Sequence, residues 1–253
     1  MKRVIIVQAR LGSTRLPGKV LMDLAGRPML AQQIVRLRRC RQAEAIVIAT
    51  TTNPLDDPIV ALAEAEGLAC YRGSEQDVLS RYVEAARMVR AEIVVRVTAD
   101  CPLIDAAVTD RVVEILTAGP ESCDYATNTL ERTYPRGLDV EALTMEALER
   151  CHRLATTEQD REHVTSLIRR SAGDQFRVVS VKDAHDNSDL RWTVDTQADM
   201  DLMRRIYAGL DLGRECKTYP EILVWVRSHP GLSDANAGVE TWDPISKPPK
   251  HRH

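Results

Sequence analysis

The sequence predicts an α/β protein in which helices cover both faces of a mostly parallel β-sheet. Short apolar runs rich in β-branched residues recur through the N-terminal half, and amphipathic helical patterns separate them. These runs are apolar throughout instead of alternating with polar residues, which is typical of strands buried on both faces. The chain has 253 residues, of which 44% are hydrophobic, and this is enough for one large domain with a full-sized core.

The N-terminal half alternates predicted strands with predicted helices. Strands are expected at Val4–Gln8, Ala45–Thr50, Ala69–Arg72 and Ile93–Thr98. Helices are expected from Pro28 to about Arg39, from a cap at Asp56 or Asp57, and over Asp77–Arg90. Because this alternation makes the strands parallel, their carboxyl ends meet at one edge of the sheet, where ligands bind in such folds.

The C-terminal half is less regular. Helices are expected over residues 108–118, 144–154, 157–171, 199–207 and 219–228, and strands over 176–181 and 190–194. We expect one domain over residues 1–230, with an inserted lobe at about 124–172. Residues 231–253 contain three prolines and end in Lys-His-Arg-His, so we expect a tail that is poorly ordered or that orders only against a partner chain.

Composition excludes several classes of protein. The net charge of −3 argues against a general nucleic-acid binder. No apolar run approaches the roughly 18 residues of a membrane span, and the short run after Met1 is too short for a secretory signal. The six cysteines include no C-x-x-C pair, so we expect reduced thiols in a cytoplasmic protein rather than a zinc site or a disulfide framework.

The segment QARLGSTRLPGKVL, residues 8–21, directly follows the first predicted strand. It differs from a P-loop, because Gly12 and Gly18 enclose five residues and a valine follows the lysine. It also lacks the G-x-G-x-x-G pattern of dinucleotide-binding proteins. It nevertheless combines a glycine, a Pro-Gly turn and enough positive charge to bind a triphosphate. The cations are Arg10, Arg15 and Lys19. The alternative interpretation is a solvated basic loop between a strand and a helix.

Two aspartates follow predicted strands. Asp100 lies two residues past the strand that ends at Thr98, and Asp195 ends the predicted strand in RWTVDTQADM. Magnesium prefers oxygen ligands, often one or two carboxylates together with phosphate oxygens, so these aspartates are candidate Mg²⁺ ligands. The alternative is a local structural role, in which Asp100 holds a turn before Pro102 and Asp195 helps Thr196 to cap the next helix.

The segment YPRGLDVEAL, residues 134–143, alternates from Leu138 onward between apolar and acidic residues. Its polar residues could bind the hydroxyl groups of a substrate, although a half-exposed strand with a solvated face would look the same. These residues are Arg136, Gly137, Asp139 and Glu141. His163, in the helical pattern DREHVTSLI, is a weaker candidate, because a lone helical histidine is usually a core or surface residue.

Several blocks, taken in order, resemble the cytidylyltransferase family, which includes the synthetases of CMP-acylneuraminate and CMP-3-deoxy-octulosonate. The match is closer to its spore-coat polysaccharide biosynthesis protein F branch and runs from about residue 3 to about residue 207. After the loop QARLGSTRLPGKVL and LAGRPML, the blocks are RGSEQDVLSRY (72–82), RVTADCPLID (96–105), YPRGLDVEAL (134–143), DREHVT (160–165) and LRWTVDTQADM (190–200).

The resemblance implies a Rossmann-like core of the nucleotide-diphospho-sugar transferase type, with a small α/β lobe that often mediates a homodimer. It implies Mg²⁺ on Asp100 and Asp195, and a triphosphate on the cations of the first loop. The residues implied in nucleotide binding are Gln8, Ala9, Arg10, Leu11, Gly12, Ser13, Arg15, Lys19, Arg72, Asp77, Arg96, Thr98 and Asp100. Those implied in acceptor binding are Arg136, Gly137, Asp139, Glu141, Glu162 and His163.

The activity implied is transfer of CMP from CTP to a small anionic acceptor, with release of pyrophosphate. The acceptor would be a sugar keto-acid or a phosphorylated or phosphonate metabolite. Thr98 stands where the sugar-acid synthetases carry a glutamine, so a UTP- or GTP-using sugar-phosphate nucleotidyltransferase is one alternative. A nucleotide-binding module without catalysis is the other.

Overall fold

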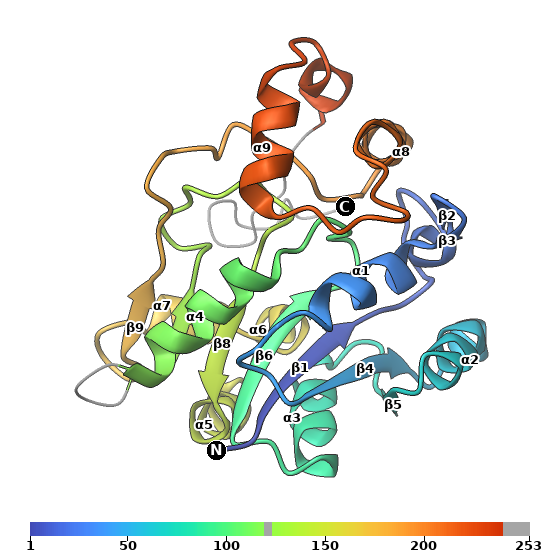
Figure 1. Ribbon diagram of the computed structural model, residues 1–253. Coiled ribbons are helices and arrows are strands. Elements are labelled where there is room, and N and C mark those ends of the chain that lie inside the picture. The colour runs from blue at the N-terminus through green and yellow to red at the C-terminus, as the bar shows by residue number, and fades with distance from the viewer. Residues whose placement is uncertain (119–122, 240–253) are drawn as a thin grey trace, which may run out of the picture.

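A seven-stranded sheet runs through the computed structural model, which describes residues 1–118 and 123–239 (Figure 1). The strand order is β5-β4-β1-β6-β8-β7-β9. The strands are β1 (Arg3–Gln8), β4 (Ala45–Thr51), β5 (Ala69–Gly73), β6 (Ile93–Thr98), β7 (Tyr125–Thr127), β8 (Glu141–Thr144) and β9 (Val178–Ser180). As predicted, β5, β4, β1 and β6 are parallel, whereas β8 runs antiparallel to both of its neighbours, β6 and β7. A separate hairpin pairs β2 (Asp23–Leu24) with β3 (Arg27–Pro28).

Helices cover both faces of the sheet, which confirms the predicted fold class. One face carries α1 (Met29–Leu37), α2 (Asp57–Ala65), α4 (Ala106–Ala118), α8 (Gln197–Gly209) and α9 (Tyr219–Arg227). The other carries α3 (Val78–Met88), α5 (Met145–Leu154) and α7 (Ser166–Arg170), with α6 (Glu158–His163) against α3. Successive residues of β1 explain the two layers, because Ile5 packs in the first apolar cluster and Ile6 in the second, and both are fully buried.

Two sequence predictions in the C-terminal half are wrong. Residues 190–194 form no strand, because Arg191 makes only an isolated bridge with Arg136 and the Val194 N–H then donates to Asp100 O (2.8 Å). A change of partner within a few residues prevents a continuous ladder. The helix expected over 157–171 is broken into α6 and α7 at Val164, whose φ of 58° is left-handed and unfavourable for a β-branched residue.

Two further expectations need adjusting. The strand expected over 176–181 is only β9, at Val178–Ser180. The alternating segment becomes a strand at Glu141, although Leu138 and Val140 before it are fully buried as the alternation predicts. The strands of the expected lobe, β7 and β8, belong to the main sheet, where β8 pairs with β6.

The register of the parallel strands assembles the edge on which the site is built. Gln8 at the end of β1 lies opposite Thr98 at the end of β6 and opposite Ala49 of β4. Arg72 of β5 lies opposite Thr50. The segments that leave these strand ends therefore meet at one edge, as the sequence predicts.

The C-terminal segment folds back toward this edge. Of the expected tail, residues 231–239 are described and include the 3₁₀ helix η3 (Ser233–Asn236). The Asn236 amide donates to Arg191 O (3.1 Å) and to Asp199 Oδ1 (2.8 Å). Residues 240–253 and Gly119-Pro120 lie outside the described residues. Within residues 1–118 and 123–239, no helix combines the length and the apolarity needed to cross a membrane.

Candidate active site

The loop after β1 is folded by its own backbone and delivers Lys19 to the interior. Leu11 O accepts hydrogen bonds from the N–H groups of Ser13 (2.8 Å) and Gly18 (3.0 Å), which closes the loop. Gly18 has a left-handed φ of 70° and immediately precedes the 3₁₀ helix η1 (Lys19–Leu21). Lys19 is consequently only 8% exposed. A solvated basic loop would leave this ammonium in water, so that interpretation is wrong for Lys19.

Asp56 ties the loop to the neighbouring strand. The sequence suggests a helix cap here, and Asp56 does occupy the N-cap position of α2, but its side chain makes no capping bond. The carboxylate instead accepts the Leu11 N–H (2.7 Å) and the Thr51 hydroxyl, and Asp56 is buried. This contact fixes the start of the loop over the end of β4.

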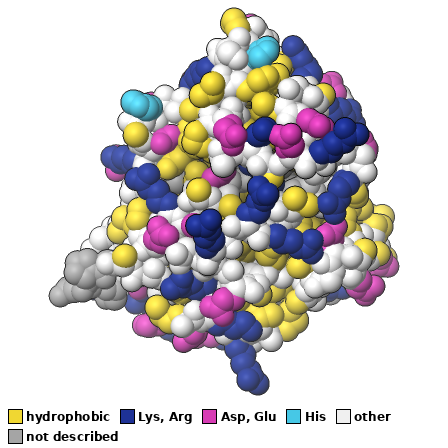
Figure 2. All heavy atoms as spheres, in the orientation of Figure 1, with side chains coloured by type: hydrophobic (Ala, Val, Ile, Leu, Met, Phe, Trp, Pro, Cys, Tyr) yellow, Lys and Arg dark blue, Asp and Glu magenta, His cyan; other side chains and the backbone are white. Residues whose placement is uncertain are grey.

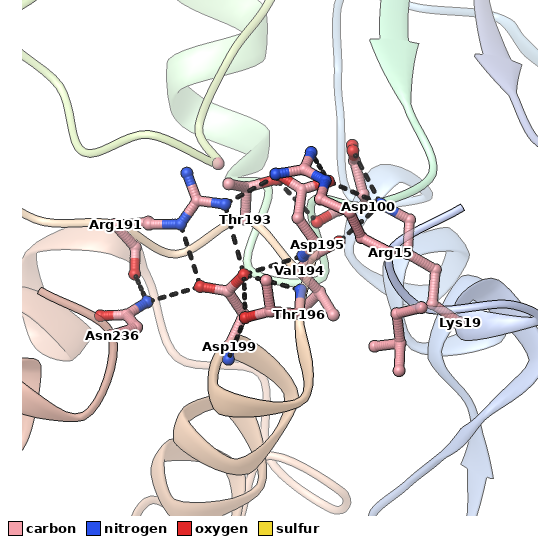
Figure 3. Close-up of polar contacts among 12 residues, drawn as sticks. Arg15, Lys19, Asp100, Arg191, Thr193, Val194, Asp195, Thr196, Asp199 and Asn236 are labelled. Atoms are coloured by element: carbon pink, nitrogen blue, oxygen red, sulfur yellow. Dashed lines mark hydrogen bonds and ion pairs between the residues drawn. The ribbon is translucent and has the colours of Figure 1, made fainter. Parts of the chain in front are cut away.

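Lys19 lies between the two predicted metal ligands (Figure 3). Its Nζ is 2.8 Å from Asp195 Oδ1 and 3.3 Å from Asp100 Oδ2, and it also donates to Val194 O (2.7 Å). Burial alone would lower the pKa of Lys19, but the two carboxylates outweigh it, so the pKa is raised. Burial alone would likewise raise the pKa of Asp100, and Lys19 and the Thr98 hydroxyl lower it overall. The three groups are therefore charged together at neutral pH.

The two aspartates are brought together by backbone contacts between distant segments. The Val194 N–H donates to Asp100 O (2.8 Å), and the Thr193 hydroxyl donates to the same oxygen (3.3 Å). The Thr98 hydroxyl, 2.6 Å from Asp100 Oδ1, orients the first carboxylate.

A buried network supports Asp195 from below (Figure 3). Arg191 Nη2 donates to Asp195 Oδ2 (2.8 Å), while Arg191 Nε donates to Asp199 Oδ1 (2.9 Å). Asp199 is fully buried and accepts the N–H groups of Asp195 and Thr196 (2.9 Å each), in a capping box with Thr196 at the start of α8. Arg15, on the solvent side, reaches Asp195 Oδ1 (3.0 Å). Arg191 and Asp199 are functional candidates that the sequence analysis missed.

The donor set of this pair fits a magnesium ion. Asp100 and Asp195 present carboxylate oxygens, the ligand type that Mg²⁺ prefers, and two carboxylates leave room for phosphate oxygens and water. In the part of the chain that the structure describes, no group of three or more histidines, cysteines, aspartates and glutamates could hold a metal by itself.

A cavity of about 280 Å³ opens beside the end of β6. Five of the predicted site residues line it, namely Arg96, Thr98, Arg136, Asp139 and Glu141. Arg132 and Arg169 complete its positive lining; Arg169 has a buried Nε without a hydrogen-bond partner among the described residues. The sequence held no signal for Arg169, because its helix lies far along the chain from the strands that it faces.

The two carboxylates of this cavity are already paired. Asp139 binds both terminal nitrogens of Arg132 (2.6 and 2.8 Å), and Glu141 binds Arg96 (2.8 Å). Gly137, which lies next to the cavity-lining Arg136, has a structural requirement of its own. Its φ is 105°, and a Cβ would lie 2.5 Å from the Trp192 backbone. A role of Gly137 in ligand contact is therefore unnecessary to explain the glycine.

The other predicted acceptor residues lie elsewhere. A second cavity, of about 680 Å³, is lined by Arg10, Asp77, Glu162 and neighbouring residues of α6. Arg10 reaches Glu75 (3.8 Å) there, and Asp77 pairs with Arg161 (3.3 Å). His163 lines neither cavity, and burial lowers its pKa. The structure thus separates Glu162 and His163 from the Arg136–Glu141 segment.

Two arginines near the loop behave differently from expectation. Arg72 donates to Thr51 O (2.9 Å) and Asn53 O (3.0 Å), which holds the segment after β4. Arg81, missed in the sequence analysis, is fully buried, and its guanidinium nitrogens have no hydrogen-bond partner among the described residues. Burial lowers its pKa. Gln8 Oε1 is likewise buried without a partner.

Comparison with known proteins identifies the family. Residues 4–218 match the family model described as "Cytidylyltransferase". The chain belongs to the cytidylyltransferase family. This cytidylyltransferase is 32% identical, over 241 residues, to the uncharacterized protein MJ1063 of Methanocaldococcus jannaschii, and the match covers 94% of this chain and 96% of that protein. It is 30% identical over 210 residues to the spore coat polysaccharide biosynthesis protein SpsF of Bacillus subtilis, covering 81% and 85% respectively.

Solved structures agree with the predicted fold. A cytidylyltransferase from Leptospira borgpetersenii superposes with a TM-score of 0.88 at 29% identity, covering 96% of this cytidylyltransferase and 100% of that chain. A CMP:2-keto-3-deoxy-manno-octonic acid synthetase complexed with CTP gives a TM-score of 0.64 at 22% identity, covering 83% and 100%, and this supports the shared fold. The chain is therefore a nucleotidyltransferase enzyme of α/β architecture, as the sequence predicts.

Proposed function

We propose that the protein transfers CMP from CTP to a small anionic acceptor and releases pyrophosphate, with Mg²⁺ held by Asp100 and Asp195. The observation that carries this proposal is the convergence of a loop lysine with two aspartates beside an arginine-lined cavity. Lys19, Asp100 and Asp195 come from three separate segments and meet within 3.3 Å of the lysine nitrogen. Family membership supports CTP as the nucleotide.

The reaction proposed is an in-line displacement at the α-phosphorus of CTP. A bond forms between an acceptor oxygen and this phosphorus, the bond to the bridging oxygen breaks, and the electron pair leaves with pyrophosphate. Catalysis in such transfers rests mainly on positioning and on charge neutralisation. When bound, the magnesium ion would neutralise phosphate charge and polarise the α-phosphate.

The chain's own cations divide the remaining work. Arg10, Arg15 and Lys19 lie on one loop and would stabilise the β- and γ-phosphate oxygens as charge moves onto pyrophosphate. Thr98, which hydrogen-bonds Asp100 (2.6 Å), would hold that carboxylate in orientation. We expect Lys19→Ala to reduce turnover by at least a hundredfold, or about 2.7 kcal/mol in the barrier, with little loss of folded protein.

The acceptor is proposed to bind in the cavity beside β6. Arg96, Arg132, Arg136 and Arg169 outnumber the carboxylates Asp139 and Glu141 by two. This excess of positive charge favours an anionic acceptor, either a sugar keto-acid or a phosphorylated or phosphonate metabolite. Thr98 lines the cavity and contacts Asp100, so an acceptor there would adjoin the proposed metal site.

We also propose that the protein is a homodimer, on the strength of its resemblance to the family alone. Light scattering coupled to size-exclusion chromatography would give the mass in solution directly. A mass near that of one chain at micromolar concentration would contradict this part of the proposal.

The deciding experiment measures pyrophosphate release with Mg²⁺, one nucleotide and one acceptor at a time. CTP, UTP and GTP are each combined with keto-deoxy sugar acids, phosphoglycerate and small phosphonates. Release that requires CTP and one acceptor class supports the proposal. Release with UTP or GTP would identify a sugar-phosphate nucleotidyltransferase of different base specificity. Tight CTP binding without release across a broad panel would favour a non-catalytic module.

A further inference from the structure

The carboxylate oxygens of Asp100 and Asp195 are all occupied by groups of the protein itself. Asp195 Oδ1 is bound by Lys19 (2.8 Å) and Arg15 (3.0 Å), and Oδ2 by Arg191 (2.8 Å). Asp100 Oδ2 is 3.3 Å from Lys19, and Oδ1 accepts the Thr98 hydroxyl (2.6 Å). The ammonium of Lys19 therefore lies between the carboxylates, where a shared divalent cation would have to bind (Figure 3).

We propose that Lys19 occupies the place of the divalent cation in the nucleotide-free protein and leaves it for the triphosphate when nucleotide binds. The metal site then exists only with nucleotide present, and metal and Lys19 exclude each other at the carboxylate pair. This inference rests on the proposed function for the metal ligands, but it concerns the order of binding, which the proposed function leaves open.

Charge balance supports the exchange. In the free protein, the cations Lys19, Arg15 and Arg191 match the three carboxylates of Asp100, Asp195 and Asp199. A divalent cation added alone would bring two uncompensated charges into a largely buried cluster, which is unfavourable. A nucleoside triphosphate adds negative charge at the same time and gives the loop cations new anionic partners.

The site is also divided into groups that can move and groups that are held. Arg15 is half-exposed, with 48% of its side chain accessible, and Asp195 is the one ion-pair partner it has among the described residues. Lys19 has a long, flexible side chain on the short helix η1, directly after the glycine turn. Arg191, in contrast, is clamped between Asp195 and the fully buried Asp199. Lys19 and Arg15 could therefore turn to phosphate while Arg191 keeps Asp195 in position.

The experiment measures Mn²⁺ binding by electron paramagnetic resonance, without and with a CTP analogue that carries a methylene group between the α- and β-phosphorus. For the wild type we expect at least tenfold tighter Mn²⁺ binding with the analogue than expected from Mn²⁺ bound to the free analogue alone, and no comparable site without it. We expect Lys19→Met to bind Mn²⁺ without nucleotide at least tenfold more tightly than the wild type.

Three controls separate exchange from a simple change of charge. Lys19→Arg keeps a cation and should not gain the site. Lys182→Met removes one charge from an exposed pair with Glu131 and should bind Mn²⁺ as the wild type does. Adding Asp100→Asn to Lys19→Met should abolish the gain. Circular dichroism confirms that each variant is folded.

Two results would overturn the exchange. One is a nucleotide-free wild type that binds Mn²⁺ as tightly as in the presence of the analogue. The other is a folded Lys19→Met variant that shows no gain. Failure of the analogue to bind would instead count against the proposed function, because the comparison of the nucleotide-free variants would still report on Lys19.

Discussion

Replacing Asp199 by alanine tests the support beneath the proposed metal site. Asp199 is fully buried and accepts hydrogen bonds from Arg191 Nε (2.9 Å), Asn236 Nδ2 (2.8 Å) and the backbone N–H groups of Asp195 and Thr196. Its removal leaves Arg191 buried with one carboxylate in place of two and deprives α8 of its capping box.

The expected loss follows from these contacts. Breaking a buried ion pair by removing one partner costs about 3–5 kcal/mol. Because Arg191 keeps its ion pair with Asp195 (2.8 Å), we take the lower end, about 3 kcal/mol, and count the lost cap within it. The assay is urea unfolding at pH 7, which gives the free energy of unfolding of each variant.

Asp201 provides a matched control on the same helix. Its side chain is 57% exposed and lies 3.4 Å from Arg204, so Asp201→Ala should change the free energy of unfolding by no more than about 0.5 kcal/mol. If Asp199→Ala lost less than about 1 kcal/mol, or no more than Asp201→Ala, the argument that Asp199 carries this network would be refuted.

The pH dependence of stability gives a second check on Asp199. Burial alone would raise the pKa of this carboxyl, but its bonds to Arg191 and Asn236 outweigh burial, so the folded-state pKa lies below the usual value. A depressed folded pKa contributes stability that is present above the unfolded pKa, about 3.9, and is lost as pH falls through the folded pKa. The difference in stability between the wild type and Asp199→Asn should therefore be full at pH 6 and shrink below about pH 4. A difference that did not change between these values would contradict the assigned charge state.

Three other substitutions test the site and the fold. Arg169→Met should raise the KM for the acceptor at least tenfold, because it removes one cation of the cavity, and leave the KM for CTP within twofold; equal effects on both would place Arg169 outside the acceptor site. Asp100→Asn should lower kcat at least a hundredfold, about 2.7 kcal/mol, and weaken the response to Mg²⁺; an unchanged Mg²⁺ titration would remove Asp100 from the metal site. Gly137→Ala should cost about 3 kcal/mol in urea unfolding, because the new Cβ would lie 2.5 Å from the Trp192 backbone at a φ of 105°. Gly67→Ala, at a φ of 65° with nothing within 4 Å, should cost only about 1 kcal/mol, and equal losses would show that the clash is relieved.

Elements with strong local signals were predicted correctly. Strand β6 spans Ile93–Thr98 as expected, and α3 begins directly after Asp77, whose carboxylate accepts the Ser80 N–H (2.8 Å). An apolar run and a capping aspartate act over a few neighbouring residues, so the sequence alone shows them. The rim location of the first loop also followed, because the carboxyl ends of parallel strands must share an edge.

Elements defined by distant partners were not predicted. The run at 190–194 has the β-branched, apolar composition of a strand, but its backbone bonds go to Arg136 and then to Asp100. The break at Val164 likewise has no helix-breaking residue to announce it. In both places contacts made across the fold override the local pattern.

The sequence by itself determined the chemistry available to this protein. It placed a basic loop and Asp100 at the ends of predicted strands, and its ordered blocks indicated the cytidylyltransferase family to which the chain belongs. Only the tertiary structure decided how those groups are used. It brought Lys19 between Asp100 and Asp195, set Arg191 and Asp199 beneath them, and assigned Glu141 and Glu162 to different cavities. The physical reason is that charges interact strongly only when they are buried and a few ångströms apart, and in this chain such proximity is created by packing between segments that lie far apart in sequence.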